Sequence, residues 1–109
     1  MLMMPPHLRP ILLELRARLS TSFGARLQEV RLFGSYARGE ATEESDVDVL
    51  VLIDHLVPSE IAVVADATTR LALETGVGLA AVPMASERFG PAEPRRGFVG
   101  EVDREGERP

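Results

Sequence analysis

Ser45-Asp46-Val47-Asp48-Val49-Leu50-Val51-Leu52-Ile53 is the stretch that decides how this chain folds. From Val47 to Ile53 nearly every residue is β-branched or leucine, which predicts a buried central strand. Side chains alternate between the two faces of a strand, so Asp46 and Asp48 are expected on the same face, with their Cα atoms about 6.6 Å apart. Two carboxylates at that spacing can bind one metal ion or a pair of ions.

A second stretch, Leu32-Phe33-Gly34-Ser35-Tyr36-Ala37-Arg38-Gly39, places a glycine and a serine at the end of a short strand predicted over Leu27–Phe33. Gly34 would let a phosphate approach the backbone, because no Cβ stands in the way. Ser35 would offer a hydroxyl and an amide at the start of a helical turn, where phosphate oxygens are favoured. Arg38 is either a phosphate contact or an exposed ion-pair partner of the acidic loop that follows.

Each half of this pattern has an ordinary structural explanation. A glycine-serine pair after a strand is often only a turn. A lone pair of aspartates at a strand end is commonly a solvated edge or a helix cap. The two halves together, at this spacing, favour a nucleotide and metal site.

The surrounding pattern predicts two helices and a third strand. Regularly spaced leucines predict a helix from near Leu8 to Phe23. Ser59 is the expected N-cap of a second helix that runs to about Thr75. A third strand is expected over Val77–Val82, with Pro83 ending it.

These elements predict an α+β (α/β layered) fold, in which helices pack on a small mixed sheet. A chain of 109 residues is expected to form one domain, 1–109. Its core would span about 8–85, and 86–109 would form a short carboxy-terminal helix or tail.

Composition excludes several classes of protein. The chain has no cysteine, so it forms neither disulfides nor thiolate metal sites. No apolar run approaches the roughly 20 residues that cross a bilayer, and the first residues do not resemble a signal peptide. We therefore expect a cytoplasmic protein without a membrane partner. The net charge of −5 argues against general nucleic-acid binding.

The pattern Gly34-Ser35, ten residues, Asp46, any residue, Asp48 resembles the nucleotidyltransferase superfamily that includes DNA polymerase β, CCA-adding enzymes and aminoglycoside nucleotidyltransferases. The wider match looks like the minimal nucleotidyltransferases, the antitoxin type among them. The predicted order of elements agrees with that group from about Leu8 to Val82.

The resemblance implies a nucleotidyltransferase fold and a set of site residues. Asp46 and Asp48 would be the catalytic residues and the ligands of Mg²⁺, two ions with a bound nucleotide. Gly34, Ser35 and Arg38 would bind the nucleotide. The implied reaction moves a nucleoside monophosphate, AMP from ATP, to a hydroxyl group of a partner protein.

The implied partner is a small helical toxin of the HEPN type, and a homo-oligomer stays open as an alternative. Active relatives usually carry a third carboxylate on a later strand. Here Ala80 or Ala81 occupies that position. The sequence therefore leaves a second hypothesis, a catalytically weak or inactive binding module that neutralises its partner by contact alone.

Overall fold

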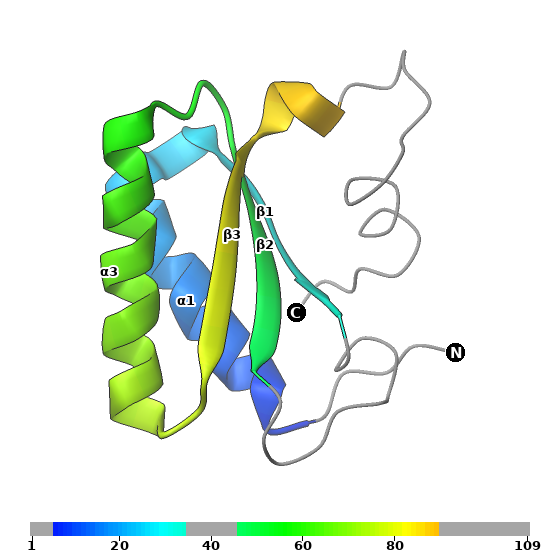
Figure 1. Ribbon diagram of the computed structural model, residues 1–109, viewed down its shortest axis with the longest axis vertical. Coiled ribbons are helices and arrows are strands. Elements are labelled where there is room, and N and C mark those ends of the chain that lie inside the picture. The colour runs from blue at the N-terminus through cyan, green and yellow to red at the C-terminus, as the bar shows by residue number, and fades with distance from the viewer. Residues whose placement is uncertain (1–5, 35–45, 90–109) are drawn as a thin grey trace.

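Three strands form one mixed sheet in the computed structural model, which describes residues 6–34 and 46–89. The strands are β1 (Leu27–Phe33), β2 (Val47–Ile53) and β3 (Leu79–Ala85). They lie in the order β1-β2-β3, with β1 antiparallel and β3 parallel to β2 (Figure 1). The predicted bounds of the first two strands are confirmed: apolar residues begin and end β1, and β2 is apolar at every position but Asp48.

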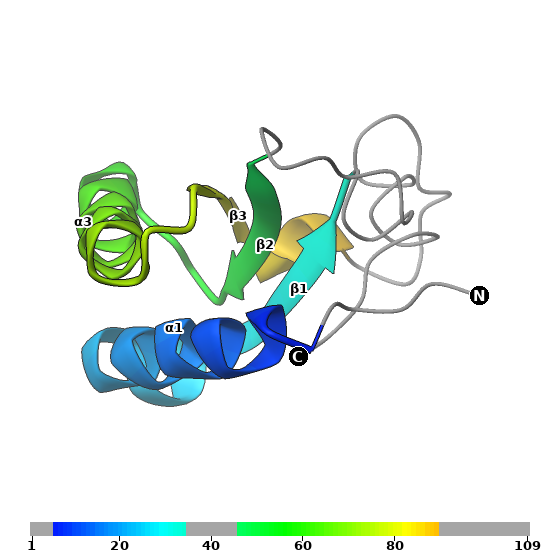
Figure 2. The same cartoon turned by 90° about the horizontal axis from the view of Figure 1, so that it is seen from below.

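Both long helices pack on the same face of this sheet, side by side (Figure 2). They are α1 (Leu8–Phe23) and α3 (Pro58–Thr75), and two short 3-10 helices span Gly24–Arg26 and Ser86–Phe89. Buried side chains of α1, α3 and the sheet form the main core: Leu8, Leu12, Leu15, Leu19, Phe23, Val30, Leu32, Val47, Val49, Val51, Ile53, Val64 and Leu71. The predicted span of α1 is confirmed, since its leucines recur on one helical face.

The second helix begins earlier than predicted, so the assignment of Ser59 as its N-cap is wrong. Val57 is the N-cap and Pro58 occupies the first turn, where its missing N–H costs no hydrogen bond. Val57 has no side-chain acceptor, and its carbonyl accepts the Glu60 N–H at 2.9 Å. The Glu60 carboxylate in turn accepts the Val57 N–H at 3.1 Å, so an acid in the first turn replaces the expected serine cap.

The third strand also differs from the prediction. It starts at Leu79 rather than Val77 and continues through Pro83, which lies in register with Val51. Within the described part of the sheet β3 is an edge strand, and proline is tolerated there because one side of the strand makes no ladder bonds. The predicted turn at 35–38 and the tail at 90–109 lie outside the described residues.

The other face of the sheet carries a smaller apolar cluster. Phe33, Leu50 and Leu52 are buried there, with Val82 and Met84 packed against them. Asp48 belongs to this same face, because it alternates with the core residues of β2. In the described part of the chain no helix is both long and apolar enough to cross a membrane.

Candidate functional site

The two predicted carboxylates lie where three strand ends meet. Asp46 directly precedes β2 and is exposed, and Asp48 is the second residue of β2 and half-buried. Asp48 pairs with Phe33 at the end of β1 and with Ala80 near the start of β3. The sheet thus brings both aspartates to the end of the sheet at which β1 finishes and β2 and β3 begin. We call this end the carboxylate edge.

Gly34 closes one side of the carboxylate edge. It is buried, its φ is +75°, and a Cβ added there would lie 2.4 Å from Asp48 Oδ2. A side chain at this position would therefore be strained and would collide with the carboxylate. The sequence singled out Gly34 for the approach of a phosphate, and the structure adds that Gly34 makes room for Asp48.

A second glycine, Gly78, closes the other side. Its carbonyl accepts the Val47 N–H at 2.8 Å, which ties the start of β2 to the residue before β3. A Cβ added at Gly78 would lie 2.6 Å from Asp46 Oδ1. Sequence reasoning missed this residue, because a glycine just before a strand ordinarily indicates only a turn.

The register identifies which alanine stands beside the aspartates. Ala80 is paired with Asp48 and shares its face, whereas Ala81 packs against the main core. Over residues 6–34 and 46–89, His, Cys, Asp and Glu side chains form no group of three that could hold a metal ion. The carboxylate pair has no third acidic neighbour among these residues.

The donor set at the carboxylate edge fits Mg²⁺. The ion prefers oxygen ligands, and in proteins it is commonly held by one or two carboxylates while water and substrate phosphates complete its octahedron. Asp46 and Asp48 supply two such carboxylates on one face. Ser35 and Arg38, the other predicted nucleotide contacts, lie outside the described residues.

The opposite end of the sheet contains a network of hydrogen bonds around Arg26. Arg26 donates two hydrogen bonds to the Glu60 carboxylate, at 2.7 and 2.6 Å. It also donates to the carbonyls of Asp54 and His55, at 3.1 Å each. The bonds from Arg26, with that from the Val57 N–H, lower the pKa of Glu60 to about 2. This clasp joins the start of β1 to the start of α3.

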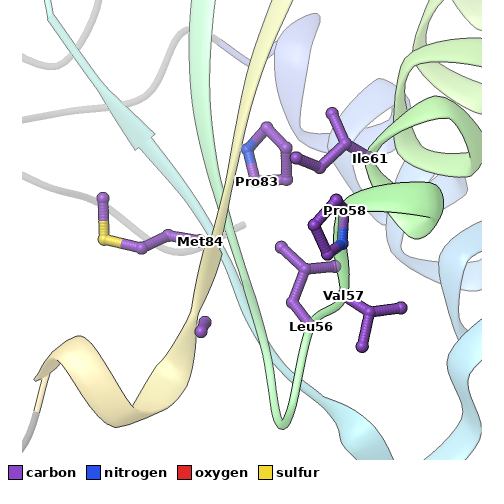
Figure 3. Close-up of a pocket in the computed structure, with 7 residues that line it drawn as sticks. Leu56, Val57, Pro58, Ile61, Pro83 and Met84 are labelled. Atoms are coloured by element: carbon purple, nitrogen blue, oxygen red, sulfur yellow. The ribbon is translucent and has the colours of Figure 1, made fainter.

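A shallow groove lies at this same end of the sheet (Figure 3). Its lining comes from the connection between β2 and α3, from the first turn of α3 and from β3: Leu56, Val57, Pro58, Ile61, Pro83, Met84 and Ala85. Met84 lies four residues along β3 from Ala80, or about 13 Å. The groove has no charged lining residue and is remote from the carboxylates, so it does not suit a phosphate.

Comparison with known proteins gives one family. The nucleotidyltransferase domain family matches residues 12–93. A candidate protein adenylyltransferase of Methanocaldococcus jannaschii is 39% identical over 71 residues, 65% of this chain and 67% of the relative. The protein adenylyltransferase MntA of Thermococcus cleftensis is 50% identical over 45 residues, 41% of this chain and 43% of the relative.

Two solved structures have the same fold. A toxin-antitoxin crystal structure with AMP-PNP has a TM-score of 0.57 at 22% identity, covering 87% of this chain and 69% of that chain. A mutant of the toxin-antitoxin MntA-HpeT has a TM-score of 0.52 at 20% identity, covering 84% of this chain and 66% of that chain. The predicted fold, a small mixed sheet with helices packed on it, is confirmed.

Proposed function

This chain belongs to the nucleotidyltransferase domain family, and we propose that it transfers AMP from ATP to a hydroxyl group of a partner protein in a Mg²⁺-dependent reaction. The observation that carries the proposal is the juxtaposition of Asp46, Asp48 and Gly34 at the carboxylate edge. The names of the relatives, protein adenylyltransferases, support a protein as acceptor and adenylate as the group transferred.

Asp46 and Asp48 are the residues that would hold the metal. Bound there, Mg²⁺ would neutralise the charge of the triphosphate and of the leaving pyrophosphate. The two aspartates would hold that metal where β1 ends, and Ser35 and Arg38 would contact the phosphates of the nucleotide. Gly34 would keep the backbone open on that side.

The transfer itself balances without another reactant. The acceptor oxygen forms a bond to the α-phosphorus of ATP, and the bond from that phosphorus to the bridging oxygen breaks. Pyrophosphate leaves, and the hydroxyl proton passes to water. Ala80 offers no base beside Asp48, so this chain would contribute positioning and charge rather than proton abstraction.

We place the reaction in a toxin-antitoxin pair. Both structural neighbours are described as toxin-antitoxin structures, and this supports a toxin as the protein partner. The partner that we propose is a small helical protein of the HEPN type, with this chain as the antitoxin. A homo-oligomer is the alternative assembly.

The position of Ala80 favours a second candidate function. A carboxylate there would flank Asp48, and alanine cannot ligate a metal or accept a proton. A protein that binds its partner without modifying it would need only the surface of this fold. On this second hypothesis the chain is catalytically weak or inactive and neutralises its partner by contact alone, with or without bound nucleotide.

Calorimetric titration of ATP tests whether the chain has the nucleotide site that the transfer requires. Wild type and Asp48→Asn would be titrated first with Mg²⁺ and then with EDTA. We expect binding by wild type that disappears with EDTA and in the variant. Absence of binding by wild type under both conditions would leave only the contact module.

Whether the partner protein accepts the adenylyl group is tested by co-expression. The chain would be co-expressed with a HEPN-type protein encoded beside it, and the mass of that protein measured. We expect one adenylyl group on the partner with wild type and none with Asp46→Asn. An unmodified partner that still co-purifies with wild type would contradict the enzyme.

A further inference from the structure

We propose that Gly78 is a positioning residue: because it has no side chain, it leaves room for the Asp46 carboxylate in the place where that carboxylate can bind metal. The inference rests on the proposed function for the role of Asp46 as a ligand. It goes beyond that function because it assigns a task to a residue that directly precedes β3 and carries no functional group.

The evidence is that the Asp46 carboxylate lies where a side chain at position 78 would begin. A Cβ built on Gly78 would lie 2.6 Å from Asp46 Oδ1 and 3.6 Å from its Cγ. Real Cβ atoms essentially never approach another heavy atom closer than 3.0 Å. The Asp46 carboxylate therefore occupies space that any other amino acid at position 78 would fill.

Glycine at position 78 is explained by the space that the Asp46 carboxylate occupies, and not by the backbone conformation. Among the described residues the glycines with positive φ are Gly24, Gly34 and Gly76, and Gly78 has no such conformation. Gly78 therefore lacks the positive φ that would strain an alanine at this position. The Gly78 carbonyl also keeps its bond from the Val47 N–H, since that bond involves only main-chain atoms.

A substitution at Gly78 is thus expected to move a side chain and leave the fold intact. Asp46 is exposed, and its carboxylate lies at the end of a flexible side chain. A new methyl group would turn that carboxylate toward solvent at little cost. The pair formed with Asp48 would lose its geometry, although both acids remain.

Gly78→Ala is the direct test, read by the binding of Mn²⁺ with ATP and by urea denaturation. We expect metal affinity to fall by about tenfold to a hundredfold, the usual effect of disturbing groups that orient metal ligands. The urea midpoint should stay close to that of wild type. Unchanged metal affinity would overturn the positioning role while leaving the proposed function in place.

Gly76→Ala is the matched control two residues earlier. Its φ is +74°, and a Cβ there meets nothing within 4 Å. This variant should lose stability through backbone strain and yet bind Mn²⁺ as wild type does. If Gly76→Ala lost affinity as Gly78→Ala does, general destabilisation would explain both and the proposal would fall.

A double variant tests whether Gly78 acts through Asp46. In an Asp46→Ala background the space beside residue 78 is free, so adding Gly78→Ala should weaken Mn²⁺ binding no further. A further loss, or a double variant that fails to fold, would indicate a different structural role for Gly78. Failure of wild type to bind Mn²⁺ with ATP would overturn the proposed function itself, and the positioning role with it.

Discussion

At the level of single residues, Gly34 carries two constraints that can be measured apart. Its φ of +75° and that of Gly76, +74°, are almost the same, but a Cβ at Gly34 meets the Asp48 carboxylate and one at Gly76 meets nothing within 4 Å. We expect Gly76→Ala to lower the free energy of unfolding by about 1 kcal/mol, from backbone strain alone. Gly34→Ala should lose more, because a half-buried carboxylate must also move. Equal losses in urea denaturation would show that the Asp48 contact has no energetic weight.

Ala80 offers the converse experiment, a gain of function. Because Ala80 pairs with Asp48, Ala80→Asp would place a third carboxylate on the same face. Like charges should lower the stability of the metal-free protein, and Mg²⁺ should restore it. We expect metal to bind about tenfold more tightly, since ligand charge tunes affinity. Ala80→Asn, of equal size and no charge, is the control and should show neither effect in a calorimetric titration.

The two aspartates of the candidate site could be predicted from the sequence, but the glycine that lies beside Asp46 could not. Asp46 and Asp48 are legible because a strand alternates its side chains, and that is a local rule. The contact between Asp46 and Gly78 joins residues far apart in the sequence and depends on the register of two parallel strands. Local patterns do not encode that register, so Gly78 could be recognised only from the structure.

At the level of elements, the ends of a helix or strand were predicted correctly where the flanking residues clearly differ from those inside it. β1 and β2 have the predicted bounds because each begins and ends with an apolar residue that is flanked by a polar residue or glycine. The assignment of Ser59 as N-cap failed because Glu60 supplies the capping interaction from inside the first turn. Pro83 did not end β3, because an edge strand tolerates a missing N–H.

The clasp between Arg26 and Glu60 makes stability depend on pH. The pKa of Glu60 falls to about 2, below its value in the unfolded chain, because it accepts bonds from Arg26 and from the Val57 N–H. A lowered pKa in the folded state stabilises the protein above the unfolded value, and this contribution is lost as pH falls toward 2. Glu60→Gln should therefore melt at a lower temperature than wild type at pH 7. Thermal melts of the two proteins should converge as pH falls from 4.5 to 2, and a constant difference would contradict the assignment.

At the level of the whole molecule, the two faces of the sheet have different tasks. One face packs on α1 and α3 and holds the main core, while the other carries Asp48 beyond a small apolar cluster. Membership of the nucleotidyltransferase family, expected from the spacing of the motif, is confirmed by the match over residues 12–93. The fold thus places the main core on one face of the sheet and Asp48 of the candidate site on the other.

Nucleotide bound at the two aspartates should raise the stability of the whole protein. A ligand that binds only the folded protein raises the free energy of unfolding, by about 2.7 kcal/mol at a hundredfold excess over its Kd. We expect ATP with Mg²⁺ to raise the melting temperature of wild type. EDTA or Asp48→Asn should remove the increase. A rise of the same size in Asp48→Asn would place the nucleotide elsewhere.

The glycine beside Asp46 also has a genetic consequence. Every glycine codon becomes an alanine codon through a change of its second base, so one point mutation at position 78 would weaken metal binding while the protein still folds. Catalysis would then fall without a loss of the folded protein. An active transferase and an inert antitoxin built on this fold would be neighbours in sequence space, separated by a single base.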